Sequence, residues 1–131
     1  MPETAAPDHG TPPLILVVDD HADGRELCVE ALRLFGFRTA EAADGLQAVA
    51  SAVSLAPASI VMDLSLPGID GWEAARRIKS DARTRDIPII ALTGHAAAGE
   101  QARFAAGGFD GVLAKPLVPE DLVATVTRVL R

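Results

Sequence analysis

Several polar residues in this sequence stand directly at the ends of apolar runs. This position makes them stronger candidates for a chemical site than polar residues in a loop. Asp19 and Asp20 follow the run LILVV, and Asp63 ends the run SIVMD. Thr93 follows IPIIAL, and Lys115 follows GVLA. A buried charge is costly without compensation, so each aspartate either emerges at the surface or lies beside a partner. These residues are the candidates for a chemical site.

Three carboxylates at one place would require a cation. Two carboxylates about 4 Å apart repel by about 4 kcal/mol at an effective dielectric constant of about 20. Lys115 supplies one positive charge, but a hard divalent ion matches several oxygens better. Mg²⁺ typically binds one or two carboxylates together with waters and a phosphate oxygen. The pattern therefore predicts a Mg²⁺ site suited to a phosphoryl group.

Five predicted strands, most of them apolar runs, alternate with five helical patterns. The predicted strands cover residues 14–19, 38–42, 59–63, 87–93 and 111–114. The predicted helices cover residues 22–35, the region around 46–53, the region around 72–78, residues 98–106, and a final segment from Pro119. Continuous apolar strands alternating with helices predict an α/β fold with a parallel sheet covered on both faces. Ligands of such sheets collect at the carboxyl ends of the strands, where the candidate residues lie.

The buried faces of the first two helices are predicted from the spacing of their apolar residues. For the first helix the predicted stripe is Leu27, Cys28, Ala31, Leu32, Leu34 and Phe35. For the second helix it is Leu46, Val49, Ala50 and Val53.

The segments VVDD, VMDLSLPGIDG, LTGH and LAKP occur in this order, each at the end of a predicted strand. Together they resemble the receiver domain of bacterial two-component response regulators, over residues 14–131. The resemblance implies a flavodoxin-like, doubly wound, five-stranded parallel sheet of order 2-1-3-4-5 with five helices. Residues 1–13, which contain four prolines, are predicted to form a disordered lead-in.

The resemblance also implies roles for the acidic residues. Asp63 would be the phosphoacceptor, and its phosphoryl donor would be a histidine kinase or a histidine phosphotransfer protein. Asp20, Asp63 and the backbone carbonyl of Ser65 would bind Mg²⁺ directly, and Asp19 would act through water. Such a domain phosphorylates and dephosphorylates itself and is not a conventional turnover enzyme.

Two further residues receive roles by resemblance, and one position departs from the family. A cis Lys115–Pro116 bond would aim Lys115 inward, where its side chain would contact Asp63 or the phosphate. The hydroxyl of Thr93 would donate a hydrogen bond to a phosphoryl oxygen. Val112 stands where many receivers have an aromatic ring that swings inward. This departure keeps open an alternative function, a protein-interaction module with the same fold that works without phosphorylation.

Simpler interpretations remain open for single residues. Asp19 or Asp20 alone could cap the following helix, and His9, His21 and His95 show no metal-ligand spacing and are expected in loops or at the surface. The basic run over residues 76–85 is expected to be a solvated helix face and its exit loop.

Composition narrows the function classes. The net charge of -6 disfavours direct binding of nucleic acid. An acidic strand edge also disfavours a flavin with its anionic phosphate. Without an apolar stretch of about 18 residues there is no predicted membrane span, and the expected location is cytoplasmic, with an unknown output partner.

Overall fold

The computed structural model describes residues 11–94 and 100–131, which form a five-stranded parallel sheet and five helices. The strands are β1 (Leu14–Val18), β2 (Arg38–Ala42), β3 (Ser59–Asp63), β4 (Ile89–Thr93) and β5 (Gly111–Ala114). The helices are α1 (Ala22–Leu34), α2 (Gly45–Leu55), α3 (Gly71–Ser80), α4 (Gln101–Ala106) and α5 (Pro119–Val129). The sheet order is β2-β1-β3-β4-β5. The predicted fold is thereby confirmed.

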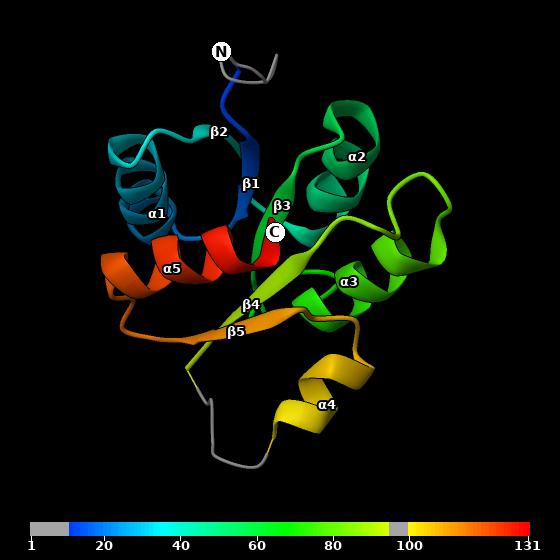
Figure 1. Cartoon of the computed structure of the whole chain (residues 1–131). Helices are drawn as coiled ribbons and strands as arrows, with labels where there is room; N and C mark the ends of the chain where they lie inside the picture. Colours follow the sequence, from blue (N-terminus) through cyan, green and yellow to red (C-terminus); the bar gives the residue numbers. More distant parts are fainter. Residues whose placement is uncertain (1–10, 95–99) are drawn as a thin grey trace.

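Helices cover both faces of the sheet (Figure 1). Helices α1 and α5 pack on one face, whose strand residues include Ile15, Val17 and Val61. Helices α2, α3 and α4 pack on the other face, against residues such as Leu16 and Ile60. Because side chains alternate between the faces of a strand, the continuous apolar runs divide into two separate cores.

The bounds of β2, β3 and β5 match the predicted ranges, whereas those of β1 and β4 differ by one or two residues. Strand β1 ends at Val18, one residue before the predicted end at Asp19. The amide of Asp19 donates a hydrogen bond to the carbonyl of Ala42 at 3.1 Å. Strand β4 begins at Ile89, after Pro88, which has no amide to donate to a neighbouring strand. Part of the predicted helix 98–106 and most of the predicted lead-in 1–13 lie outside the described residues.

The predicted apolar stripes of α1 and α2 were partly wrong. The buried residues of α1 are Cys28, Val29, Ala31 and Leu32, whereas Leu27, Leu34 and Phe35 are exposed. The buried residues of α2 are Gly45, Ala48 and Ala52, whereas Leu46 and Ala50 are exposed. In α2 the small residues let the helix approach its neighbours closely: a Cβ on Gly45 would lie 2.5 Å from Cγ1 of Ile69. Apolar residues extend beyond the packed face of each helix, so their spacing alone did not identify that face.

Helices α3 and α4 contact each other through aromatic rings. The rings of Trp72 on α3 and Phe104 on α4 stack with centroids 5.2 Å apart, and Phe109 meets Trp72 edge-on. A Cβ on Gly107 would lie 2.5 Å from Cζ3 of Trp72. Trp72 and Phe104 are therefore packing residues between α3 and α4.

Hydrogen bonds fix the amino ends of the strands. One carboxylate oxygen of Asp110, just before β5, accepts from the amide of Ile89 at 2.9 Å and from Nζ of Lys79 at 3.2 Å. Nζ of Lys79 also donates to the carbonyl of Ile87 at 2.8 Å. The end of α3 and the starts of β4 and β5 are therefore joined at the edge opposite the candidate site.

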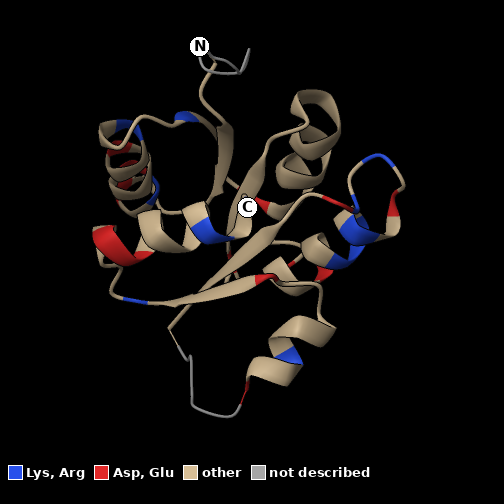
Figure 2. Ribbon diagram, viewed as in Figure 1, with Lys and Arg blue, Asp and Glu red and all other residues tan. Residues whose placement is uncertain are grey.

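Charged residues gather on the outer side of α3. Figure 2 shows Lys and Arg along the second half of α3 and in the loop that follows it. Arg76 and Arg77 both pair with Glu73, at 2.6 and 2.8 Å, and these arginines hold the pKa of the Glu73 carboxyl down at about 2. This is a solvated helix face, as expected. Within residues 11–94 and 100–131, no helix is long and apolar enough to cross a membrane.

Candidate functional site

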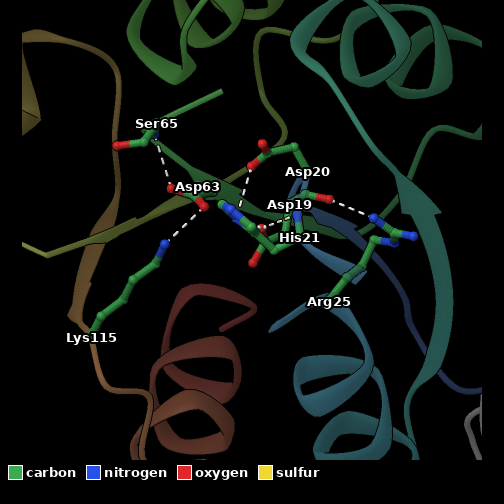
Figure 3. A network of polar contacts seen from close by, with 7 residues as sticks. All are labelled: Asp19, Asp20, His21, Arg25, Asp63, Ser65 and Lys115. Atoms are coloured by element: carbon green, nitrogen blue, oxygen red, sulfur yellow. Dashed lines mark hydrogen bonds and ion pairs between the residues drawn. The ribbon is translucent and has the colours of Figure 1, made fainter. Parts of the chain in front are cut away.

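The three predicted aspartates converge at the carboxyl ends of β1 and β3. These strands are parallel neighbours in which Val18 pairs with Met62, so the residues that follow reach the same edge. Asp19, Asp20 and Asp63, together with the adjacent His21, each offer one ligand atom, and these atoms all lie within 4.8 Å of one another. Figure 3 shows the four side chains around one point. We call them the acidic cluster.

Two carboxylates of the acidic cluster are buried. Asp19 is 3% exposed and Asp63 is 1% exposed, whereas the side chain of Asp20 is 28% exposed. Burial raises the pKa of the Asp19 carboxyl, and the nearby charge of Asp63 raises it further. One oxygen of Asp19 accepts a hydrogen bond from the amide of His21 at 2.9 Å, which opposes this rise. The cluster thus confines negative charge in a place that water only partly reaches.

Asp63 is held from both sides. Its Oδ1 accepts a hydrogen bond from the amide of Ser65 at 3.0 Å, and its Oδ2 accepts one from Nζ of Lys115 at 2.8 Å. Lys115 follows β5, and its backbone amide donates to the carbonyl of Thr93 at 2.9 Å. The Lys115–Pro116 peptide bond is cis, as the resemblance implied. Figure 3 shows Lys115 reaching Asp63 from the side opposite Asp20.

Thr93 lies at the same edge of the sheet. It is the last residue of β4, is 8% exposed, and pairs with Ala114 of β5. On the other side of β4, Leu92 pairs with Asp63. The fold therefore places Thr93 beside the strand that carries Asp63, and all six residues predicted for the site lie at one sheet edge.

The helix-capping interpretation of Asp19 and Asp20 was wrong. The N-cap of α1 is His21, and no side chain donates or accepts a capping hydrogen bond there. The Asp19 carboxylate instead accepts from the amide of His21, before the first turn of the helix. Both aspartates are therefore available to the site.

The sequence reasoning missed three residues that shape the site. Gly24 packs under Asp19: a Cβ there would lie 2.6 Å from Oδ2 of Asp19. Arg25 donates to the carbonyl of Asp19 at 2.7 Å and to the carboxylate of Glu41 at 2.9 Å. The Nδ1 atom of His21 lies 3.2 Å from Oδ1 of Asp20. In the sequence, a glycine and an arginine that follow a pair of aspartates give only a weak indication that they belong to a site.

The family model of the response regulator receiver domain matches residues 15–127. The chain belongs to this family. The receiver domain is also similar to curated relatives. The phosphate regulon transcriptional regulatory protein PhoB of Pseudomonas aeruginosa is 44% identical over 120 residues, covering 89% of this chain and 51% of that protein. The transcriptional regulatory protein PrrA of Mycobacterium tuberculosis is 36% identical over 121 residues, covering 92% of this chain and 51% of that protein. The chain thus spans about half the length of these relatives.

Solved receiver structures share the fold. A putative response regulator from Chloroflexus aurantiacus matches with a TM-score of 0.86 and 31% identity, covering 92% of this receiver domain and 98% of that chain. The receiver domain of the sensor histidine kinase PA1611 from Pseudomonas aeruginosa matches with a TM-score of 0.83 and 35% identity, over the same shares of the two chains. That structure is described as holding a magnesium ion coordinated in its active site cleft.

Proposed function

We propose that this receiver domain accepts a phosphoryl group on Asp63 from a histidine kinase or a histidine phosphotransfer protein. The observation that supports this most directly is the pair of hydrogen bonds that aim the Asp63 carboxylate, from Ser65 and from Lys115. A carboxylate on a rigid strand end, with a cation 2.8 Å away, is oriented for attack on phosphorus. Carboxylate nucleophiles that form acyl phosphates are an established type.

The acidic cluster fits Mg²⁺ as the resident ion. Its carboxylates are the hard oxygen ligands that Mg²⁺ prefers, and their mutual repulsion is relieved by a divalent cation. Asp20 and Asp63 would bind the ion directly with the carbonyl of Ser65, and Asp19 would hold a water on it. The bound ion would neutralise charge on the phosphoryl oxygens.

The chain's own residues then perform the transfer. One oxygen of Asp63 forms a bond to phosphorus as the P–N bond of the donor phosphohistidine breaks, and the donor imidazole leaves with the electron pair. Nζ of Lys115 and the hydroxyl of Thr93 bind oxygens of the arriving phosphoryl group. Such transfer depends mainly on positioning and on stabilisation of spread negative charge.

The phosphoryl group would act as a signal through protein contacts. The bound phosphoryl group carries up to about two negative charges, one more than the Asp63 carboxylate that it modifies, and attraction of Thr93 toward them would reposition the chain after β4. Direct binding of nucleic acid by this domain is not part of the proposal, since its net charge is -6. We also propose a cytoplasmic location, where histidine kinases phosphorylate their regulators, and residues 14–131 as the receiver unit.

The alternative is signalling without phosphorylation, which Val112 favours. Val112 is half-buried against the core under α2, α3 and α4, and it has no aromatic ring to swing inward with Thr93. Under this alternative, partner binding is the same with and without a phosphoryl group.

The test is phosphorylation of the purified chain. The wild-type protein is incubated with Mg²⁺ and acetyl phosphate, and intact-mass spectrometry measures the added phosphoryl group; beryllofluoride binding is measured in parallel by NMR. We expect modification of the wild type, none of Asp63→Asn, and normal modification of the control Asp23→Asn, which removes an exposed charge outside the acidic cluster. A wild-type protein that takes up neither phosphoryl group nor beryllofluoride would overturn the proposal.

A further inference from the structure

Arg25 links the first turn of helix α1 to the edge strand β2. Its Nη1 donates a hydrogen bond to the backbone carbonyl of Asp19 at 2.7 Å, and its Nε donates to the carboxylate of Glu41 on β2 at 2.9 Å. Figure 3 shows the bond to Asp19 on the side of the acidic cluster away from Lys115. Arg25 therefore reaches the site through the backbone of Asp19 and not through a carboxylate of the cluster.

Both polar backbone groups of Asp19 are tied to β2. The pairing of β1 with β2 ends at Val18 and Ala42, and the amide of Asp19 donates to the carbonyl of Ala42 at 3.1 Å. The carbonyl of Asp19 is tied to the same strand indirectly, through Arg25 and Glu41. The guanidinium thus extends the hold of β2 on the chain beyond the last pair of strand residues.

The carbonyl of Asp19 belongs to the peptide group that joins Asp19 to Asp20. A peptide group is planar, so a fixed carbonyl also fixes the plane in which the Cα of Asp20 lies. The direction in which the Asp20 side chain leaves the backbone depends on that plane. Because the Asp20 carboxylate is proposed to bind Mg²⁺ directly, its direction bears on ion binding.

The shape of the guanidinium suits this role. A guanidinium is a rigid planar fork whose donors point in fixed directions, whereas the Lys ammonium is a point charge on a flexible stem. Arg25 uses two donors of the fork, one on Glu41 and the other on Asp19. The side chain of Glu41 is 50% exposed, and ion pairs open to solvent add little to stability. The arrangement therefore serves orientation more than it holds the fold together.

We propose that Arg25, oriented by Glu41, is a positioning residue for Mg²⁺ binding and for phosphoryl transfer to Asp63. It holds the carbonyl of Asp19 and thereby aims the Asp20 carboxylate at the ion. This inference rests on the proposed function for the place of the ion and of the reaction. Loss of the guanidinium leaves every metal ligand in the chain, so saturating Mg²⁺ restores most of the transfer rate.

The test measures phosphorylation by acetyl phosphate as a function of Mg²⁺ concentration, followed by intact-mass spectrometry. Loss of a group that orients a metal ligand typically weakens metal binding about 10- to 100-fold. We expect Arg25→Ala to raise the half-saturating Mg²⁺ concentration about tenfold and to leave the maximal rate nearly unchanged. Arg25→Lys keeps the charge but not the fork, so it is expected to stay close to Arg25→Ala. Full recovery of the wild-type Mg²⁺ dependence in Arg25→Lys would overturn the inference.

Arg33→Ala is the matched control. Arg33 also lies on α1 and reaches β2, where its Nε donates to the hydroxyl of Thr39 at 3.1 Å. The substitution removes the same charge and a contact between the same two elements, but toward the amino end of β2 and away from the site. A normal half-saturating Mg²⁺ concentration is expected. An increase as large as that of Arg25→Ala would point to general weakening of α1 and would overturn the inference.

A double-mutant cycle tests whether Arg25 and Glu41 act as a unit. Glu41→Ala is expected to raise the half-saturating Mg²⁺ concentration by a smaller factor, and the double variant is expected to resemble Arg25→Ala alone. Effects that simply multiply, or an Arg25→Ala protein with the Mg²⁺ dependence of the wild type, would overturn the inference. Failure of the proposed function is distinct, because the wild type itself would then take up no phosphoryl group at any Mg²⁺ concentration.

Discussion

Replacing Asp19 by asparagine is expected to make the metal-free protein more stable. Asparagine has nearly the same shape, and its side-chain oxygen is able to accept the hydrogen bond that the amide of His21 donates to Asp19. The substitution removes one of two buried carboxylates whose oxygens lie within 4.8 Å of one another. At that distance two unit charges repel by roughly 3.5 kcal/mol at an effective dielectric constant of about 20.

The measurable gain is smaller than this repulsion. Nζ of Lys115 lies 2.8 Å from Asp63 and already compensates part of its charge. We therefore expect the free energy of unfolding in EDTA at neutral pH to rise by about 1–2 kcal/mol, or the Tm to rise by about 3–8 °C. Urea denaturation measures the change, with Asp23→Asn as the control for loss of an exposed charge.

The pH dependence of this gain has a definite sign. Burial raises the pKa of the Asp19 carboxyl above the ordinary value of 3.8, so the folded protein retains a proton that the unfolded chain has lost. The free energy of unfolding of the wild type therefore falls as the pH rises from 3.8 through the folded-state pKa. The advantage of Asp19→Asn is expected to be small at the acidic end of this interval and complete above it.

Magnesium should reverse the order of the two proteins. A ligand at 100 times its dissociation constant stabilises the folded state by about 2.7 kcal/mol, and the wild type binds Mg²⁺ more tightly because it keeps the Asp19 charge. If Asp19→Asn is no more stable than the wild type in EDTA, the reasoning from buried charge repulsion is refuted.

Three further outcomes follow from packing. Gly24→Ala would place a Cβ 2.6 Å from Oδ2 of Asp19, so it is expected to displace that carboxylate and weaken Mg²⁺ binding about tenfold in calorimetric titration; unchanged affinity would contradict this. Gly107→Ala would place a Cβ 2.5 Å from the Trp72 ring, so it is expected to cost about 1–3 kcal/mol of stability and change the near-UV circular dichroism; an unchanged spectrum would show that the ring tolerates the methyl group. Burial raises the pKa of the Cys28 thiol to about 11, so a disulfide reagent at mildly alkaline pH is expected to react only after urea unfolding; rapid reaction of the native protein would show that Cys28 is accessible.

The strand ends could be predicted from sequence because two independent signals coincide there. A continuous apolar run marks each buried strand, and a polar residue at its end marks the edge of the sheet. Parallel strands carry their carboxyl ends to the same edge, so the sequence alone places Asp19, Asp63, Thr93 and Lys115 together. The order of the strands came from the family resemblance, since periodicity does not specify which strands are neighbours.

The helix faces and the residues around the acidic cluster were harder to predict. Leu34 is 82% exposed although it belongs to the predicted stripe of α1, because Cys28 and Leu32 lie at the centre of the packed face. The roles of Gly24 and His21 depend on contacts across a tight turn, and such contacts leave no periodic signal. Their identification required the distances to the carboxylates of Asp19 and Asp20.

The hydrogen bonds around Asp110 have a consequence for how the molecule tolerates change. They join Lys79 and Ile89 at the amino edge of the sheet, far from the chemistry at the other edge. Substitutions near Asp110, at the amino edge of the sheet, should therefore change the expression level and the thermal stability of the protein but not the chemistry at the carboxyl edge. Substitutions that change metal binding or signalling should instead lie at the carboxyl ends of the strands.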